Sequence, residues 1–592
     1  MRFLNMYVSK NFRPQNVMKI ASILVATLAA PVCGQPTLTA LDFQCFLNRA
    51  AKNHPYAANF DGHPTLTAND FQSFIDAYAS NSPTANCDAS GGNGWTNLSL
   101  PPGAIQFYVA ANGSDTNPGT LILPFHTVAR GIQALRDGNP DQLLLHAGDT
   151  FTINDQINLT KSARSTTQYM VIGSYGPAGP RPKIRTNGGQ GFFGNVTSTH
   201  SGLAIVGLDI QPGTIGSNQT SGILFFEDWN HILIEDCYIA NFAVNIVIQG
   251  IEEFGQPHLD DVKIRRNIIV DSNNTGSGHT QGIYVARTDS LLVEGNTFDR
   301  NGWNNNTMFS HNVYIHESCG LNHVFRDNIS ARASSHGVQL RPGGLMENNL
   351  FLANPINAYH GDSAGPGNST TRANRWNVCI DSGNINNIDQ RGQGLVVGAN
   401  GIFTEHNIVA YNAGGTGDGA VCGFILTSGM TFRGNYAFDW SMPGGGCGGV
   451  AAQWENDGGT VLSENNKFFQ PRGGAVWRIP PFNPGGGTHR NNQYVIAPTC
   501  TNFAFAANKS PLDWNAWRAI AGESGSSYSA TTPTDPHIRV GDYMTFIGAS
   551  PATLDGFLAQ CRNQSKANWN LNFISDTVND FARKRAGVTP NP

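Results

Sequence analysis

Charged residues are scarce in this sequence, and neither sign dominates. Asp, Glu, Lys and Arg make up only 13% of the 592 residues, and the formal net charge is −5. A protein that binds nucleic acid carries a broad basic field, so this composition argues against a nucleic-acid partner. Beyond residue 34 the sequence also lacks an apolar run long enough to cross a bilayer. We therefore expect no membrane span.

The pronounced apolar run of the sequence lies near its N-terminus. It covers 20–30, Lys19 precedes it, and the small residues of APVCGQ follow it. This order is typical of an export signal. We therefore expect residues 1–34 to be a signal peptide and the mature chain to be secreted, either extracellular or at the cell surface. Nine of the ten cysteines would remain, and an oxidising compartment would allow them to form disulfides.

Glycine is abundant, with 67 residues, and asparagine is frequent from about residue 190 to about residue 500. Both residue types accept the left-handed backbone of tight turns. This composition predicts a turn-rich, all-β protein.

Two near-copies of one segment follow the apolar run. PTLTALDFQCF begins at Pro36 and PTLTANDFQSF begins at Pro64. Each copy predicts a short amphipathic helix. The pair resembles the duplicated dockerin-like modules of planctomycete type, and this resemblance implies that residues 36–90 bind an extracellular anchoring partner. The alternative interpretation is a small helical hairpin without a partner.

Between the two copies, the segment ANFDGH is similar to part of a calcium-binding loop. Its predicted calcium ligands are Asn59 and Asp61, with Asp70 as the next acidic residue. Asp70 lies about two residues further along the chain than an EF-hand loop allows. Calcium is the cofactor that the sequence indicates.

A longer repeat follows a predicted linker at 91–105. An apolar-x-x-Asn motif recurs at intervals of 21 to 32 residues, with one interval of 58. This period predicts a right-handed parallel β-helix over 106–500, and FYVAANGSDTNPG near its start resembles the opening of secreted, pectin-lyase-like β-helix proteins. Residues 501–592 predict helices that close the C-terminal end. The motif positions are Cys237, Asn267, Asn296, Asn328, Asn349, Asn407, Asn435, Asn466 and Asn492.

Each rung of the predicted β-helix contains a second short strand, as in GIYVA, NVYIH and GVQLR. Alternation with a period of two residues places Tyr284, Tyr314 and Gln339 in one outward column. His316 and Arg341 fall in the next column, after Ala286. Because neighbouring rungs lie roughly 4.8 Å apart, we expect His316 and Arg341 to be neighbours. The histidines that begin successive strands, His311 and His336, should stack at the edge of the same patch.

The following rung can be aligned in two ways. Counting ten residues from the turn Asn places His360 in the tyrosine and glutamine column and Asp362 in the histidine and arginine column. The second alignment uses NVCID and places Asp381 there instead. We prefer the first, because it needs no intervening loop.

This patch suits β-elimination on a uronic acid polymer, which needs a base, an acid and groups that neutralise the carboxylate. Arg341 and Gln339 would neutralise the carboxylate. His316 or His360 would take the proton, and Tyr314 would serve as the acid or in both proton transfers. The predicted substrate-binding residues are His311, His336, Tyr284, Asp362 and Glu317.

Two other functions are compatible with the same residues. Glycoside hydrolysis needs two carboxyl groups, for which Asp362 and Glu317 are the candidates. A non-catalytic protein that binds glycans or acts at the cell surface would use the same face without chemistry, and Arg341 would then be a surface residue paired with Asp362.

The segment HESCGLNHVFRDNISARASSHGVQLRPGG resembles polysaccharide lyase family six, which contains alginate lyases and chondroitinase B. This resemblance covers about 30 residues and implies that Arg341 is catalytic. The catalytic Lys of that family is absent, because Glu317 stands in its place, and Pro342 replaces the His after the Arg. His316 would have to replace the missing base. The matching residues are Ser318, Asn328, Gly337, Leu340, Arg341 and Gly343.

Overall fold

The computed structural model forms two compact units, Met1–Ser99 with Thr589–Pro592, and Leu100–Val588. In the first unit residues 71–75 are helical, within the predicted amphipathic helix of the second copy. The predicted signal peptide and calcium ligands, Asn59, Asp61 and Asp70, lie outside the described residues. The structure describes 71–75 and 95–588, except 178, 216–220, 251–258, 275–278, 304–307, 321, 362–372, 385–390, 399–401, 416–420, 427–428, 443–447, 456–459, 480–486, 500–504 and 508–509.

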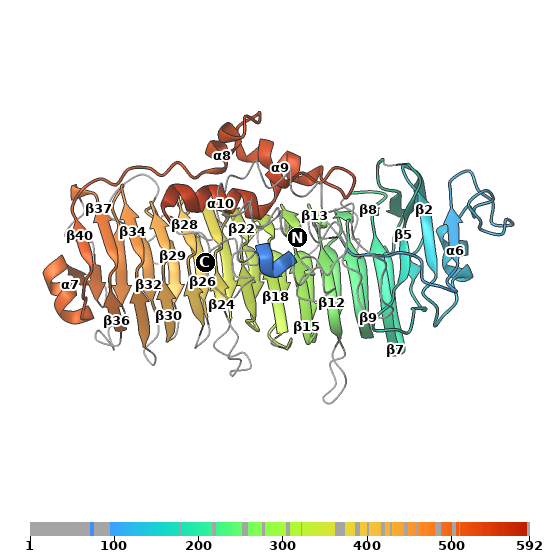
Figure 1. Cartoon of the computed structure of the whole chain (residues 1–592), viewed down its shortest axis with the longest axis horizontal. Coiled ribbons are helices and arrows are strands. Elements are labelled where there is room, and N and C mark those ends of the chain that lie inside the picture. The colour runs from blue at the N-terminus through green and yellow to red at the C-terminus, as the bar shows by residue number, and fades with distance from the viewer. Residues whose placement is uncertain are drawn as a thin grey trace. The chain divides into compact units, whose positions relative to one another are not determined.

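The second unit is a parallel β-helix, as the repeat predicts, with rungs stacked along one long axis (Figure 1). Each rung contributes strands to three faces. The strands of the first face, which carries the candidate site, are β4 (Ile157–Asn158), the first part of β7 (Phe192–Val206) and of β9 (Ser221–Glu235), β11 (Val244–Gln249), β14 (Gln281–Ala286), β17 (His311–Ile315), β20 (His336–Leu340), β23 (Ile356–His360), β26 (Gly392–Val397), β29 (Val421–Leu426), β32 (Val450–Trp454), β35 (Ala475–Ile479) and β38 (Phe505–Ala507).

The second face follows the first within each rung, and β7 and β9 bend from one into the other. Its further strands are β1 (Gln106–Val109), β2 (Gln142–His146), β5 (Met170–Tyr175), β12 (Asp260–Arg265), β15 (Ser290–Glu294), β18 (Asn322–Arg326), β21 (Leu345–Glu347), β24 (Ala373–Arg375), β27 (Phe403–Glu405), β30 (Met430–Arg433), β33 (Val461–Glu464) and β36 (Gly487–Arg490).

The third face lies after the turn asparagine and forms a separate sheet. Its strands are β3 (Thr150–Ile153), β6 (Lys183–Thr186), β8 (Asp209–Pro212), β10 (Tyr238–Ala240), β13 (Ile268–Val270), β16 (Thr297–Asp299), β19 (Ile329–Ala331), β22 (Leu350–Asn354), β25 (Val378–Ser382), β28 (Ile408–Ala410), β31 (Tyr436–Phe438), β34 (Lys467–Gln470), β37 (Gln493–Ile496) and β40 (Ser527–Ser529).

The turn asparagines form a continuous ladder inside the solenoid. Each side-chain Nδ2 donates to the Oδ1 of the asparagine on the next rung, at 2.8–3.1 Å. This confirms the predicted stacking and adds Asn377, which belongs to a regular rung within the interval of 58 residues. Cys237, at the start of the ladder, is fully buried as predicted.

Glutamate and arginine alternate along one outer column of the second face. Register places them opposite one another on successive rungs. Side-chain ion pairs join neighbours at distances from 2.6 to 3.4 Å. The column consists of Glu235, Arg265, Glu294, Arg326, Glu347, Arg375, Glu405, Arg433, Glu464 and Arg490.

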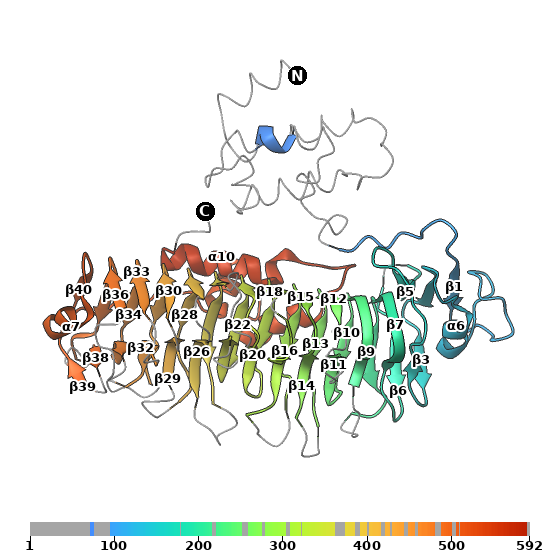
Figure 2. The ribbon, with the colours of Figure 1, turned by 90° about the horizontal axis from the view of Figure 1, so that it is seen from below.

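Different segments cover the two ends of the solenoid. Helix α6 (Val128–Ala134) packs on β1 and β2 at the N-terminal end, and α7 (Trp514–Ala521) packs near β36, β38 and β39 (Ser510–Leu512) at the other. The expectation that all of 501–592 closes the C-terminal end is corrected. Helices α8 (Val540–Phe546), α9 (Leu554–Arg562) and α10 (Ser575–Ala586) and a 3₁₀ helix (Leu571–Phe573) instead lie along the third face (Figure 1). Figure 2 shows α10 running beside the stacked strands.

The third face explains why these helices turn back. Its outward residues, among them Leu352, Ile380 and Tyr411, form one apolar cluster with Tyr543, Phe557 and other helix residues. Docking of the helices removes the apolar side chains of both surfaces from water, which stabilises this path of the chain. In the part of the chain that the structure describes, no helix is long and apolar enough to cross a membrane.

Among the residues that the structure describes, the cysteines form no disulfide. Cys237, Cys319, Cys379, Cys422 and Cys561 are free and buried, and burial raises the pKa of each thiol. They therefore act as small core residues.

Candidate functional site

The outward column of the first face forms as the alternation predicts. Tyr284 pairs in register with Tyr314, and Tyr314 with Gln339. The two tyrosine rings lie 5.7 Å apart between centroids. The alternate residues of the same strands, such as Val313 and Val338, are fully buried in the core. The three column residues are only half-buried, so they line the surface.

Arg341 and His316 lie beside this column and are joined by a carboxylate. The Arg341 Nη1 lies 2.6 Å from Oε2 of Glu317 and donates to the Tyr314 hydroxyl at 3.2 Å. The His316 Nε2 lies 3.3 Å from the same Oε2. Each of these side chains is between a quarter and a third exposed, with 26% for Arg341 and 33% for Glu317. A solvent-borne ligand can therefore reach them.

The two ring nitrogens of His316 have different roles. The backbone N–H of Ser318 donates to Nδ1 at 3.1 Å, and the Ser318 hydroxyl lies 2.9 Å from the same atom. An atom that accepts from a backbone N–H carries a lone pair, so the proton of the neutral ring resides on Nε2. That proton faces Glu317. His316 is thus a hydrogen-bond donor toward the site.

His311 and His336 stack at the edge of the patch, as expected. Their Nδ1 atoms lie 3.1 Å apart, and the Ser335 hydroxyl lies 2.8 Å from the His336 Nδ1. Both rings are more than nine-tenths buried. Burial lowers the pKa of His336 to about 3 and holds that of His311 well below its usual value. They are neutral supports of the neighbouring tyrosines, so the prediction that they contact substrate is corrected.

The predicted position of His360 is wrong by one residue. Leu340 pairs with His360, and Gln339 pairs with Tyr359. His360 therefore points into the core, where it is fully buried, and Tyr359 extends the outward column. A shift of one residue moves every side chain of a strand to the other face. The apolar pair Ile356 and Ala358 was the sequence signal that could have fixed this alignment.

Of the two candidate acids of that rung, Asp362 lies outside the described residues, so its place at the site stays a prediction. Asp381, the rival choice, lies in β25 on the third face, 3.7 Å from the Arg539 Nε. The second alignment is therefore also wrong, because NVCID supplies a strand after the turn Asn377.

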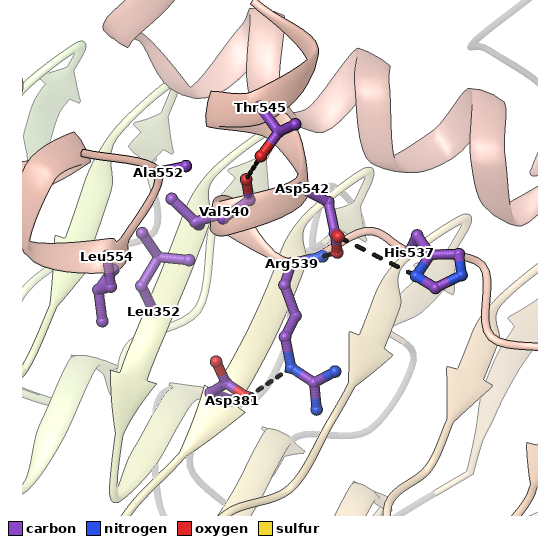
Figure 3. A pocket seen from close by; sticks show the side chains of 10 residues that line it. Leu352, Asp381, His537, Arg539, Val540, Asp542, Thr545, Ala552 and Leu554 are labelled. Carbon is purple, nitrogen blue, oxygen red and sulfur yellow. Dashed lines mark hydrogen bonds and ion pairs between the residues drawn. The ribbon is translucent and has the colours of Figure 1, made fainter. Parts of the chain in front are cut away.

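A cavity of about 350 Å³ lies between the third face and the C-terminal helices (Figure 3). Leu352 and Leu554 line its apolar side, and Asp381, Arg539 and Asp542 line its polar side. The Arg539 guanidinium lies 3.6 Å from the centre of the Tyr411 ring. Burial raises the pKa of Asp381 to about 6, with Arg539 opposing this shift. The pair of Arg539 with Asp381 links the C-terminal helices to the solenoid, and Asp542 accepts from the Arg539 backbone N–H at 3.0 Å.

Among the described residues, no group of three His, Cys, Asp or Glu side chains could hold a metal ion. The predicted calcium ligands lie outside these residues, so calcium at 59–70 stays a prediction.

Comparison with known proteins identifies similar folds and no family. No family model and no curated protein matches the chain. The similar solved structures include the tailspike protein of E. coli bacteriophage HK620 in complex with a pentasaccharide, at 12% identity and a TM-score of 0.40, over 65% of this chain and 74% of that one.

Two enzymes are also among the similar solved structures. The pectate lyase Pel9A shares 16% identity over 58% of this chain and 76% of its own, with a TM-score of 0.32. The GH136 lacto-N-biosidase from Eubacterium ramulus shares 14% identity over 72% and 68%, with a TM-score of 0.32. All three scores are below 0.5, so the activities of these proteins carry no weight for this chain. Its class, a parallel β-helix, follows from its own strand pairing.

Proposed function

We propose that this protein binds an acidic polysaccharide along the first face and cleaves it by β-elimination at Tyr314, His316 and Arg341. The observation that carries this proposal is the position of the Arg341 guanidinium, which contacts both the Glu317 carboxylate and the Tyr314 hydroxyl. β-Elimination needs this pairing, because a cation must neutralise the substrate carboxylate next to the group that moves the proton.

Tyr314 is the residue proposed to move protons. As a phenolate, its oxygen removes the proton from C5 of the uronate, and the C5 electron pair forms the C4–C5 double bond as the C4–O bond breaks. The phenol then returns its proton to the departing oxygen, which regenerates the phenolate. Arg341, 3.2 Å from the hydroxyl, stabilises negative charge on that oxygen.

His316 and Gln339 complete the proposed site as donors. The Nε2 proton of His316 points toward the carboxylate position, which favours neutralisation over a role as base. Gln339 lies in register beside Tyr314 and offers an amide donor. Tyr284 and Tyr359 continue the column on either side and suit contact with sugar rings.

The test is a panel of polymers followed by ultraviolet absorbance at unsaturated ends. Wild type should release such ends from at least one of alginate, pectate and chondroitin. Arg341→Ala should lower the rate roughly 10²–10³-fold and leave the melting temperature unchanged. The matched control is Arg433→Ala, which also removes an arginine from an ion pair with glutamate, at 2.7 Å on the second face, and should keep full activity.

Three outcomes would contradict the proposal. Reducing ends released without absorbance would indicate hydrolysis, with Glu317 and Asp362 as the residues to test. Binding without any product would indicate a glycan-binding protein. Unfolding of Arg341→Ala, but not of Arg433→Ala, would make Arg341 a structural residue.

A further inference from the structure

Glu317 occupies the position in which a substrate carboxylate is expected. Its Oε2 lies 2.6 Å from the Arg341 Nη1 and 3.3 Å from the His316 Nε2. These are the two donors that the proposed function assigns to the uronate carboxylate. The oxygen itself is buried between them, although about a third of the side chain is exposed.

The backbone holds Glu317 in this position. The chain leaves β17 after Ile315, and the His316 N–H donates to the Val285 carbonyl at 2.9 Å. The turn that follows is closed by the Cys319 N–H, which donates to the His316 carbonyl at 3.0 Å. Ser318 fixes the imidazole from the other side. Glu317 is thus held at a tight turn beside both donors.

A bound carboxylate and the Glu317 carboxylate cannot share one guanidinium edge without repulsion. A uronate must therefore displace Glu317 or bind a weakened cation. A neutral sugar gains nothing from displacing it, because hydroxyl groups bind a guanidinium more weakly than a carboxylate does. The ion pair therefore weakens the binding of uronates, because their carboxylate must compete with Glu317 for Arg341, and it leaves the binding of neutral sugars unchanged.

We propose that Glu317 is a built-in competitor for the substrate carboxylate and so sets how tightly this site binds uronates relative to neutral sugars. The inference rests on the proposed function for the identity of the ligand. Glu317 leaves Arg341 and His316 when a uronate binds, and it pairs with both of them when the site is empty. It takes no part in proton transfer.

The experiment compares Glu317→Gln with the unchanged site. Calorimetry in a Tyr314→Phe background, which leaves the ligand intact, measures the Kd of oligogalacturonate and oligomannuronate. The amide keeps the shape of Glu317 but removes its charge, so Kd should fall roughly tenfold, as expected for release of a charge-assisted hydrogen bond. A neutral oligosaccharide of equal length should bind unchanged. With Tyr314 present, KM should fall by the same factor while kcat stays within about twofold.

Two further variants separate competition from a structural role. In an Arg341→Ala background, Glu317→Gln should give no gain, because the cation for which the carboxylates compete is gone. Glu405→Gln, which removes a carboxylate from the pair with Arg433, should leave binding unchanged. If Glu317→Gln does not fold, Glu317→Ala takes its place, and the Kd for uronates is expected to fall in that variant as well.

The outcomes test the competition by Glu317 separately from the proposed lyase activity. Weaker or equal uronate binding by Glu317→Gln overturns the inference, whether or not the wild type cleaves polymer. Tighter binding without cleavage by any protein supports the inference and refutes the lyase. If no uronate binds to either form, both fail.

Discussion

At the scale of single residues, His316 shows how a local turn assigns a chemical role. A histidine beside an arginine on an open face suggests a general base. Here the backbone N–H of Ser318 occupies its Nδ1, and the remaining nitrogen carries the proton. The lone pair that a base needs is therefore engaged by the chain itself. This leaves Tyr314 as the proton-transfer residue in the proposed mechanism.

The two roles predict unequal losses. Tyr314→Phe removes the proton-transfer group and should lower kcat by roughly 10²–10⁴. His316→Gln keeps an N–H donor near Glu317 and should lower kcat by no more than about tenfold. Initial rates on the polymer that the wild type cleaves give both values. Equal loss in the two variants would return the role of base to His316.

The asparagine ladder allows a second prediction at this scale. Asn377 donates to the Met346 carbonyl at 3.0 Å and to Asn407 at 3.0 Å, and its Oδ1 accepts from Asn349. Asn377→Ala would leave buried partners unsatisfied, so the free energy of unfolding should fall by about 3 kcal/mol. Denaturant titration measures this. Asn195→Ala, at an exposed position, should change stability by less than about 0.5 kcal/mol.

At the scale of elements, the docking of α10 on the solenoid depends on a shared amide. Asn348 Nδ2 donates to Asp327 Oδ1 at 2.7 Å and to Asp576 Oδ1 of α10 at 3.2 Å. Burial raises the pKa of Asp327 to about 7; Arg326 opposes this shift, and Glu294 and Asp576 add to it. Below that pH the carboxyl is protonated, and the two acids do not repel one another.

The raised pKa of Asp327 determines how the stability of the folded state changes with pH. Between the ordinary pKa of 3.8 and about 7, the folded state holds a proton that the unfolded state has lost, so stability falls as pH rises through this window. Asp327→Asn should raise the melting temperature at pH 8 and leave it nearly unchanged at pH 4. Calorimetry at both values tests this. An equal shift at the two pH values would refute the linkage.

The elements that repeat could be predicted from the sequence. The prediction failed where the length of a single turn decides which face a side chain occupies. Eight asparagines and the column of Tyr284, Tyr314 and Gln339 follow from spacing, because stacked rungs must repeat their turns. His360 was misplaced because the turn before β23 differs by one residue, which spacing from Asn349 cannot show. The path of α8–α10 depends on apolar area distributed over many rungs, which no single segment displays.

At the scale of the whole molecule, the chain divides at residue 99. The solenoid unit contains every described residue of the candidate site, together with its own helices at the ends and flank. A chain starting at residue 95 should therefore keep the melting temperature and activity of the β-helix unit. Scanning calorimetry and the polymer assay test this. A loss of folding would mean that residues 1–94 stabilise the solenoid.

The alternating glutamates and arginines of the second face constrain how such a molecule changes in length. From Arg265 to Glu464, every charge faces the opposite sign on the rung before and on the rung after. Inserting or deleting one rung inside this stretch would set two like charges directly opposite each other, which destabilises paired strands. Inserting or deleting two rungs preserves the alternation. Duplications and losses within this solenoid are therefore least costly when they occur in even numbers.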